Sequence, residues 1–535
     1  MRKKTINRLK ILRVILAVIL FTSIVLFFLD FADILPDRLS GILQRQLMPA
    51  VFTGATATLV VYFVLTFLFG RIYCSVICPA GILQDLFNRI SCIGKKKKNG
   101  KLRFRYHKPA NRLRYAILGL TALLAFFGIT ELCLLLDPYS NFGRIATNLF
   151  RPAVVWVNNL FADFLSSKGN YSLYHVTIRT STVAWISAIV AFLTFAVMAY
   201  FRGRLFCNTI CPVGALLSLV SRYSPFRITF DKNKCNHCSL CEKSCKAEAI
   251  DSKGMTVDTS SCVTCFNCTS ACNRDSLKYR FALPVWNKKE AATGEESETS
   301  PRRAVLTKEE GSDSFANEAI SKSRRSFITT SAALAGSVPL IALAGNDPEE
   351  SPDPVTPPGS LSIERFKDLC TGCHICVVQC PTHILHPAGL KYGLGYMLKP
   401  HMSYENSYCN YSCTVCSDVC PTDAIKPITV EDKKVTQIGI ANFYKEVCVV
   451  YTDENDCGAC SEHCPSQAVH MVPYKGTLTI PQVESELCVG CGGCESICPV
   501  RPVRAIVVIS NPVHQTAQLP EEEDVKSFDV DDFGF

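Results

Sequence analysis

The chain has 535 residues, of which 48% are hydrophobic and 30 are cysteine, and its formal net charge is +9. A disulfide-stabilised secreted scaffold is excluded, because such proteins are short, whereas here only six cysteines fall in the first 230 residues and nearly all the others form tight clusters. The basic residues concentrate beside long apolar segments, which favours a membrane protein over a nucleic-acid-binding protein.

Four apolar segments in the first half are long enough to cross a membrane as helices, which takes roughly 20 residues. They cover residues 12–29, 48–69, 115–136 and 182–201. The loop between the second and third segments is rich in Lys and Arg, so the positive-inside rule places this loop, the amino terminus and the residues after Arg202 in the cytoplasm. We therefore predict an α-helical four-span domain over residues 1–225 in a bacterial cytoplasmic membrane.

A short motif occurs twice in this domain, each time after the second helix of a pair. Residues 70–81 read GRIYCSVICPAG and residues 203–214 read GRLFCNTICPVG. The two helix pairs are thus predicted to form a parallel 2+2 repeat, which would bring four cysteines together near its axis. Two interpretations of these cysteines stay open. They hold a further metal or redox centre, or they are packed thiols beside a turn that Gly and Pro shape. The four residues are Cys74, Cys78, Cys207 and Cys211.

A third pattern in the membrane domain is TGATAT, residues 53–58. It resembles a sequence at which some redox proteins attach FMN covalently through threonine. No flavin domain surrounds it, and small residues are ordinary material for helix packing in membranes. We do not expect FMN at Thr56.

Two cysteine quartets with the spacing C-x2-C-x2-C-x3-C follow in residues 226–283. In a two-cluster ferredoxin, three closely spaced thiolates hold one iron–sulfur cluster and the fourth reaches the neighbouring cluster. We therefore predict a cytoplasmic two-cluster domain of α+β ferredoxin-like fold. Its expected ligand sets are Cys235, Cys238 and Cys241 with Cys272, and Cys262, Cys265 and Cys268 with Cys245.

The next segments differ sharply in composition. Residues 284–322 are charged and poor in apolar residues, which predicts a disordered linker. Residues 323–345 begin SRRSF, continue with a weakly apolar run and end in Ala342-Leu343-Ala344, which indicates an internal twin-arginine export signal with a cleavage pattern, or a fifth apolar helix. Residues 346–360 form a Pro-rich linker. We thus expect residues 226–325 in the cytoplasm and residues 346–535 outside it.

Four more quartets lie in residues 361–512, which we predict to be an exported four-cluster ferredoxin-like domain followed by an acidic tail at 513–535. The first quartet could share its fourth ligands with the second or with the last. The quartets are Cys370, Cys373, Cys376 and Cys380; Cys409, Cys413, Cys416 and Cys420; Cys448, Cys457, Cys460 and Cys464; and Cys488, Cys491, Cys494 and Cys498.

The repeated spacing predicts six 4Fe-4S clusters in total. Zinc sites use pairs of C-x2-C rather than runs of four cysteines, and disulfides would not need such uniform spacing. An aliphatic residue recurs five positions after the last cysteine of five quartets, where it would begin a short element that packs over a cluster; these residues are Ile250, Leu277, Leu385, Ile425 and Val469. Because these segments have little apolar core of their own, metal binding must supply much of their folding free energy.

Taken together, these motifs resemble two families. Residues 1–280, with four spans, two C-x3-C-P motifs and a two-cluster ferredoxin, are similar to NapH, a membrane quinol dehydrogenase associated with periplasmic nitrate reductase. Residues 321–510 are similar to the NapG/MauM exported ferredoxin-type proteins. A fusion of two normally separate proteins would explain why the export signal is internal.

The resemblance implies electron transfer from quinol in the membrane to a periplasmic reductase or cytochrome. The lipid, the quinone pool and that exported protein would then be its partners. Asp137, Tyr139 and Arg144 are candidates for the quinone site because they are polar groups beside the third span. The alternative is a membrane redox sensor or metal-centre assembly factor, since regulators of those classes share the C-x3-C-P unit.

Overall fold

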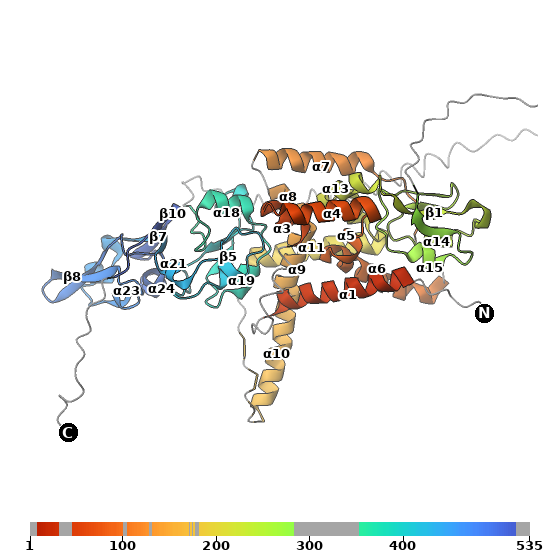
Figure 1. Cartoon of the computed structure of the whole chain (residues 1–535). Coiled ribbons are helices and arrows are strands. Elements are labelled where there is room, and N and C mark those ends of the chain that lie inside the picture. The colour runs from red at the N-terminus through yellow and green to blue at the C-terminus, as the bar shows by residue number, and fades with distance from the viewer. Residues whose placement is uncertain are drawn as a thin grey trace, which may run out of the picture. The chain divides into compact units, whose positions relative to one another are not determined.

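The computed structural model (Figure 1) describes residues 8–30, 45–99, 104–127, 131–168, 170, 172–173, 175–176, 181–282 and 353–520. The predicted linker at 284–322, the twin-arginine segment at 323–345 and most of the acidic tail lie outside the described residues. By their contacts, residues 1–284 and 352–535 belong to one unit.

Helices occupy the four apolar segments of the first half. They are α1 (Arg8–Leu29), α3 and α4 (Leu47–Phe52 and Thr56–Phe69), α7 and α8 (Asn111–Phe126 and Glu131–Leu136) and α11 (Thr182–Arg202). Only α1 and α11, among the described helices, are long and apolar enough to cross a membrane by length and composition. The second predicted span is divided at Gly54, whose φ of +67° ends α3 before α4 begins. Figure 1 shows the axes of α1, α4 and α7 lying nearly parallel.

The repeated motif forms the same structure twice. A glycine with positive φ, Gly70 or Gly203, ends the preceding long helix. A short helix with the first cysteine follows, and a second helix then starts at the proline of the motif, where its missing N–H is not needed. These pairs are α5 (Tyr73–Val76) with α6 (Pro79–Asn99), and α12 (Leu205–Thr209) with α13 (Pro212–Ser221).

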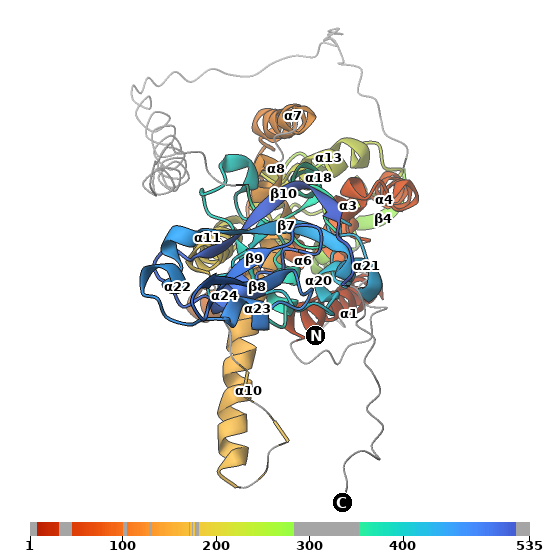
Figure 2. The ribbon, with the colours of Figure 1, turned by 90° about the vertical axis from the view of Figure 1, so that its left-hand side faces the viewer.

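A further helical stretch, which the sequence analysis did not predict, lies between the third and fourth apolar segments. It consists of α9 (Pro138–Ile145), the π-helical turn η2 (Ala146–Phe150) and α10 (Arg151–Ser166). Asp137 caps α9 by accepting a hydrogen bond from the backbone N–H of Ser140 at 2.7 Å. Helix α10 projects away from the other helices in both views (Figures 1 and 2), and its Trp156 and Phe161 are more than half exposed.

Residues 226–282 form the small α+β domain that the cysteine spacing predicts. Strand β1 (Phe226–Phe230) pairs antiparallel with β4 (Leu277–Phe281), so the two ends of the domain lie side by side. Strands β2 (Ile250–Asp251) and β3 (Thr256–Val257) form a second pair. The remaining elements are η3 (Lys232–Lys234), α14 (Leu240–Ser244) and α15 (Asn267–Ala271).

Residues 353–520, called the C-terminal region below, contain three two-stranded antiparallel sheets joined by short helices. The sheets are β5 (Leu385–Pro387) with β6 (Pro400–Met402), β7 (Thr436–Phe443) with β10 (Ile506–Thr516), and β8 (Val469–Lys475) with β9 (Leu478–Val483). The helices are α18 (Ile363–Leu369), α19 (Ile375–Gln379), η4 (Leu394–Tyr396), α20 (Val415–Asp418), α21 (Val430–Lys434), η5 (Lys445–Val447), α22 (Val449–Thr452), α23 (Ala459–Glu462) and α24 (Gly493–Ile497).

The predicted boundaries of this region need two corrections. Residues 353–360, expected to belong to a linker, are packed into the domain: Thr356 and Ser360 are fully buried, and the carbonyl of Val355 accepts a hydrogen bond from Met402 N. Strand β10 continues past residue 512, where the tail was expected to begin. In both places the backbone hydrogen bonds of the domain extend further than composition indicated.

Candidate iron–sulfur sites

The first ligand set of the small α+β domain comes together as the spacing predicts. Cys235, Cys238, Cys241 and Cys272 line one cavity of about 220 Å³. Burial raises the pKa of the Cys241 thiol to about 11, and the neighbouring thiols of Cys272 and Cys238 contribute to the same shift. The fourth cysteine of the second quartet therefore completes the first site.

The second ligand set of this domain has the reciprocal arrangement. Cys268 lies within electrostatic range of Cys245, Cys265 and Cys262. The Sγ of Cys245 also accepts a hydrogen bond from Ala249 N at 3.4 Å. The exchange of fourth ligands between the two quartets is therefore present in the described structure.

The C-terminal region has two such pairs, and here the structure settles a choice that the sequence left open. Cys376 lies near Cys370, Cys373 and Cys420, whereas Cys416 lies near Cys409, Cys413 and Cys380. The first quartet thus exchanges its fourth ligand with the second quartet, not with the last.

The third and fourth quartets of the C-terminal region form the other pair. Cys448 lies near Cys457 and Cys498, and Cys494 lies near Cys488, Cys491 and Cys464. Burial raises the pKa of Cys460 to about 11 and that of Cys491 to about 12. Thiols in such surroundings stay protonated unless a metal replaces the proton, because a thiolate is the form that binds a metal.

The loops that carry these cysteines share an unusual backbone. In four of the quartets the residues on both sides of the second cysteine have positive φ: His237 and Ser239, Thr264 and Phe266, Gly372 and His374, and Gly490 and Gly492. Left-handed residues turn the chain sharply, so that three nearby thiols can face one centre. The five aliphatic residues after the quartets are all buried, and four of them begin strands β2, β4, β5 and β8.

Each set brings together four cysteines, the number of thiolates that hold a 4Fe-4S cubane. Backbone N–H groups also point at the sulfurs of Cys420, Cys464 and Cys488, at 3.2–3.4 Å, which is an interaction that tunes the potential of iron–sulfur clusters.

The four sites of the C-terminal region follow one another in a row. Cys376 of the first site lies within electrostatic range of Cys416 of the second. Cys409 of the second site donates its backbone N–H to the carbonyl of Cys491 at 2.9 Å, and Cys494 lies near Cys460. The order of the sites is therefore that of Cys370, Cys409, Cys488 and Cys448.

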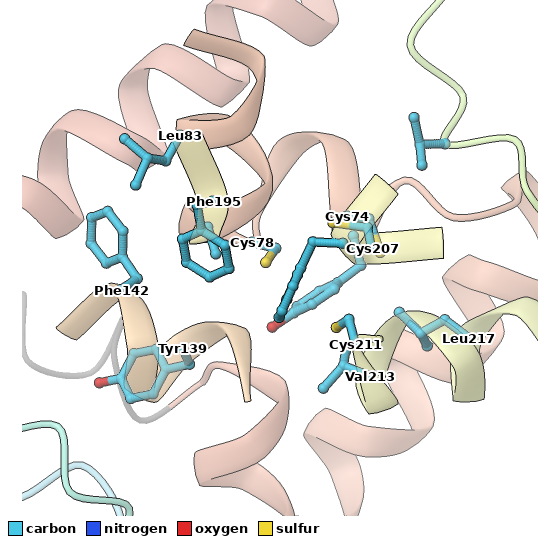
Figure 3. Close-up of a cluster of buried hydrophobic side chains, with 14 of the residues drawn as sticks. Cys74, Cys78, Leu83, Tyr139, Phe142, Phe195, Cys207, Cys211, Val213 and Leu217 are labelled. Atoms are coloured by element: carbon cyan, nitrogen blue, oxygen red, sulfur yellow. The ribbon is translucent and has the colours of Figure 1, made fainter. Parts of the chain in front are cut away.

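In the helical half, the repeat brings the motif cysteines together in the core shown in Figure 3. Cys74, Cys78, Cys207 and Cys211 are all at most 4% exposed. Each of the four thiols lies within electrostatic range of the other three. Thr56, by contrast, is an exposed residue at the start of α4.

Comparison with known families identifies the chemistry. A family described as "4Fe-4S binding domain" matches residues 49–101 and 184–231, and one described as "4Fe-4S dicluster domain" matches residues 369–424 and 455–501. The methylamine utilization ferredoxin-type protein MauM of Methylobacillus flagellatus is 32% identical over 177 residues, which cover 31% of this chain and 73% of the relative. The chain belongs to the ferredoxin-type 4Fe-4S proteins.

Other relatives of this ferredoxin-type protein agree. The ferredoxin-type protein NapF of Escherichia coli is 29% identical over 153 residues, covering 28% of this chain and 84% of the relative. The putative electron transport protein YccM of E. coli is 26% identical over 247 residues, covering 45% and 60%. No solved structure matches. At the level these relatives share, the function is iron–sulfur electron transfer.

The candidate quinone residues of the ferredoxin-type protein lie in or beside α9. Asp137, Tyr139 and Arg144 are all at most 2% exposed. Asp137 Oδ1 and Tyr139 Oη have no hydrogen-bond partner among the residues that the structure describes. Burial raises the pKa of Asp137 to about 6, although hydrogen bonds from Ser140 lower it in part.

The same segment touches the first site of the C-terminal region, which the sequence analysis did not foresee. A Cβ added at Gly143 would lie 3.0 Å from the carbonyl oxygen of Cys373. Asn148 Nδ2 lies 3.2 Å from His374 Nδ1, and Arg151 donates to Gln379 at 3.2 Å. In the sequence, only Gly143 could have indicated that α9 approaches the backbone of Cys373. A single glycine is too common to support that prediction.

Proposed function

We propose that this ferredoxin-type protein is held in the cytoplasmic membrane, oxidises quinol there and passes the electrons to a redox partner outside. The observation that carries the proposal is the row of four cysteine sites that begins against Gly143 of the helical half. A row of sites connected end to end is what a conduit needs, whereas a sensor has no evident use for so many carriers.

Six 4Fe-4S clusters are proposed, one for each of the six ligand sets. When bound, each cluster supplies a one-electron carrier whose potential depends on hydrogen bonds and exposure. The chain holds the thiols in place, shields most of them from water and directs backbone N–H groups at several sulfurs.

The quinol head group is proposed to bind beside Asp137 and Tyr139. Oxidation of a quinol releases two protons and two electrons. The unpartnered oxygen of Asp137 can accept one proton, and the other passes to water. The raised pKa of Asp137 suits a group that takes up and releases protons near neutral pH. The electrons leave one at a time toward Cys373, the ligand that contacts Gly143.

The membrane placement is supported by α1 and α11 and by apolar side chains that face outward on them. Leu12, Val18 and Ile186 are each more than half exposed, which lipid would cover. Four spans, an internal twin-arginine signal and a fusion of NapH-like and MauM-like parts complete the proposal.

Membrane vesicles that contain the full chain test this function. Menaquinol or ubiquinol is added without oxygen, and cluster reduction is followed by electron paramagnetic resonance; dithionite added afterwards gives the total reducible signal. We expect quinol to reduce clusters rapidly. If dithionite reduces them and neither quinol does, the chain is no quinol conduit, and the sensor or assembly role gains support.

A further inference from the structure

The four motif cysteines of the helical half are built into an unusually tight and symmetric packing arrangement (Figure 3). A Cβ added at Gly81 would lie 2.4 Å from the carbonyl oxygen of Cys74, and one added at Gly214 would lie 2.2 Å from that of Cys207. Each motif therefore needs its last glycine, because the helix that follows lies directly against the backbone of the first cysteine.

Two buried arginines connect the copies of the repeat in a reciprocal way. Arg71, from the first copy, donates through Nη2 to the carbonyl oxygen of Cys207 at 2.9 Å and lies 3.8 Å from the Sγ of Cys74. Arg204, from the second copy, donates to the carbonyl oxygen of Cys74. Each arginine thus reaches across to the first cysteine of the other copy, so both guanidinium groups lie beside the thiols.

The charges around the thiols do not balance. Arg71 is fully buried and has no carboxylate partner among the described residues. Arg204 shares Asp85 with Arg13 and Lys246, so three cations surround one carboxylate. Arg71 Nε and Arg204 Nη2 are buried and find no hydrogen-bond partner within the described part of the chain. A buried cation without compensation is strongly destabilising, so the region needs additional negative charge.

We propose that Cys74, Cys78, Cys207 and Cys211 bind a further 4Fe-4S cluster, in addition to the six in the ferredoxin-type regions. Four thiolates around a cubane carry the net negative charge that Arg71 and Arg204 require. A 4Fe-4S cubane takes four cysteine thiolates, which is the number that the repeat brings into this core. The family that matches both halves of the repeat is itself described as 4Fe-4S binding.

The position of this site suggests its use. Arg71 Nη1 donates to the carbonyl of Ser260 at 3.1 Å, two residues before the cluster ligand Cys262. The thiols also share one buried core with Tyr139 and Phe142 (Figure 3). The additional cluster therefore lies beside the small α+β domain and in the same buried core as Tyr139 of the proposed quinol site. Its binding does not depend on the direction of electron flow or on quinol being the donor.

Iron and acid-labile sulfide per chain test the inference in the full chain purified without oxygen. We expect seven cubanes' worth in the unaltered protein. The double variant Cys78→Ser/Cys211→Ser should lose one cubane's worth of iron and sulfide. The control Cys133→Ser should lose none, because Cys133 lies outside the motifs and donates to the carbonyl of Thr121.

Six cubanes' worth in the unaltered protein, or equal iron in the double variant and the control, would overturn the inference. The count in the unaltered protein decides the question even if the double variant does not accumulate. Failure of quinol to reduce any cluster would refute the proposed function but leave this count unaffected.

Discussion

Asp85, on α6, is the residue that joins the two copies of the repeat to the small α+β domain. It accepts hydrogen bonds from Arg13 at 2.9 Å and Arg204 at 2.7 Å, and it also binds Lys246, which neighbours the proposed cluster ligand Cys245. Burial by itself would raise the pKa of Asp85, but Arg204, Lys246 and Arg13 together hold it well below the usual range. One carboxylate therefore connects three segments that are far apart in the sequence.

Replacing this carboxylate should be costly. We expect Asp85→Asn to lower the free energy of unfolding by about 3 kcal/mol, because the buried cations of Arg204 and Lys246 and the partly buried Arg13 lose their partner. The control Asp231→Asn removes a more exposed pair with Lys234 and should cost less than about 1 kcal/mol. The depressed pKa means that the stability from Asp85 is present above about pH 4 and is lost as the pH falls below it. Denaturant unfolding in detergent at several pH values measures both effects; equal losses in the two variants would contradict the role of Asp85.

Asp137 is the residue on which proton release from quinol depends in the proposed function. Asp137→Asn keeps the size of the side chain but removes its ability to take up a proton. We expect the rate of quinol-dependent cluster reduction to fall on the order of 100-fold, the effect typical of losing a general base. Asp163→Asn, at an exposed carboxylate on α10, should leave that rate unchanged. An undiminished rate in Asp137→Asn would exclude this carboxylate as the proton acceptor.

At the scale of elements, the cysteine loops depend on backbone conformations that most residues avoid. Ser239, Phe266 and His374 are held with positive φ although they have side chains. Such strain persists only where the surroundings impose it, as a bound cluster would. The short helices α14, α15, α19 and α24 follow these turns directly and carry the third cysteine of each quartet.

Gly492 offers a sharp test of this loop geometry. A Cβ at Gly492 would lie 1.9 Å from the ring of Tyr404, so Gly492→Ala must displace either the loop or the ring. We expect loss of the cluster held by Cys488, Cys491, Cys494 and Cys464, measured as iron per chain. Gly476→Ala is the matched control, because Gly476 also has positive φ but a Cβ there would meet no atom of the described residues within 4 Å. It should cost about 1 kcal/mol and no iron. Full iron content in Gly492→Ala would show that the loop tolerates the change.

At the scale of the whole molecule, the helical half and the C-terminal region meet through a glycine. Gly143→Leu should separate α9 from Cys373 and slow quinol-dependent reduction of the clusters in the C-terminal region by about tenfold, because transfer between redox groups depends steeply on their placement. Gly119→Leu places the same side chain on α7, where no described atom lies within 4 Å of an added Cβ, and should leave the rate unchanged. Total dithionite-reducible signal checks that both variants keep their clusters. Equal rates in the two variants would mean that electrons do not cross at this contact.

Iron removal should affect the two halves differently. Each apolar cluster in residues 353–520 is built around ligand cysteines, such as Cys448, Cys488 and Cys494 beside Val450 and Ile506. Metal binding therefore supplies folding free energy there, and we expect chelation of iron to open this region to limited proteolysis. The segments of α1 and α11 should stay protected from the protease, because in the proposed function these two apolar helices lie within the membrane. Unchanged cleavage of residues 353–520 after complete iron loss would contradict this expectation.

The ferredoxin-type 4Fe-4S domains and the candidate ligand residues could be predicted from the sequence by itself, because the spacing that cluster ligands need is local. The same spacing identifies the two ligand sets of the small α+β domain and the buried aliphatic residues after the quartets. The repeat of the C-x3-C-P motif is equally readable, since each copy is one continuous stretch.

Contacts between residues that are distant in the sequence were decided only by the tertiary structure. The exchange of Cys380 and Cys420 between the first two quartets of the C-terminal region, the reciprocal reach of Arg71 and Arg204, and the contact of Gly143 with Cys373 all join separate segments. Helix α10 and the packed Pro-rich segment at 353–360 were missed for the same reason. The local backbone conformation is determined by neighbouring residues, whereas packing partners come into contact only when the whole chain folds.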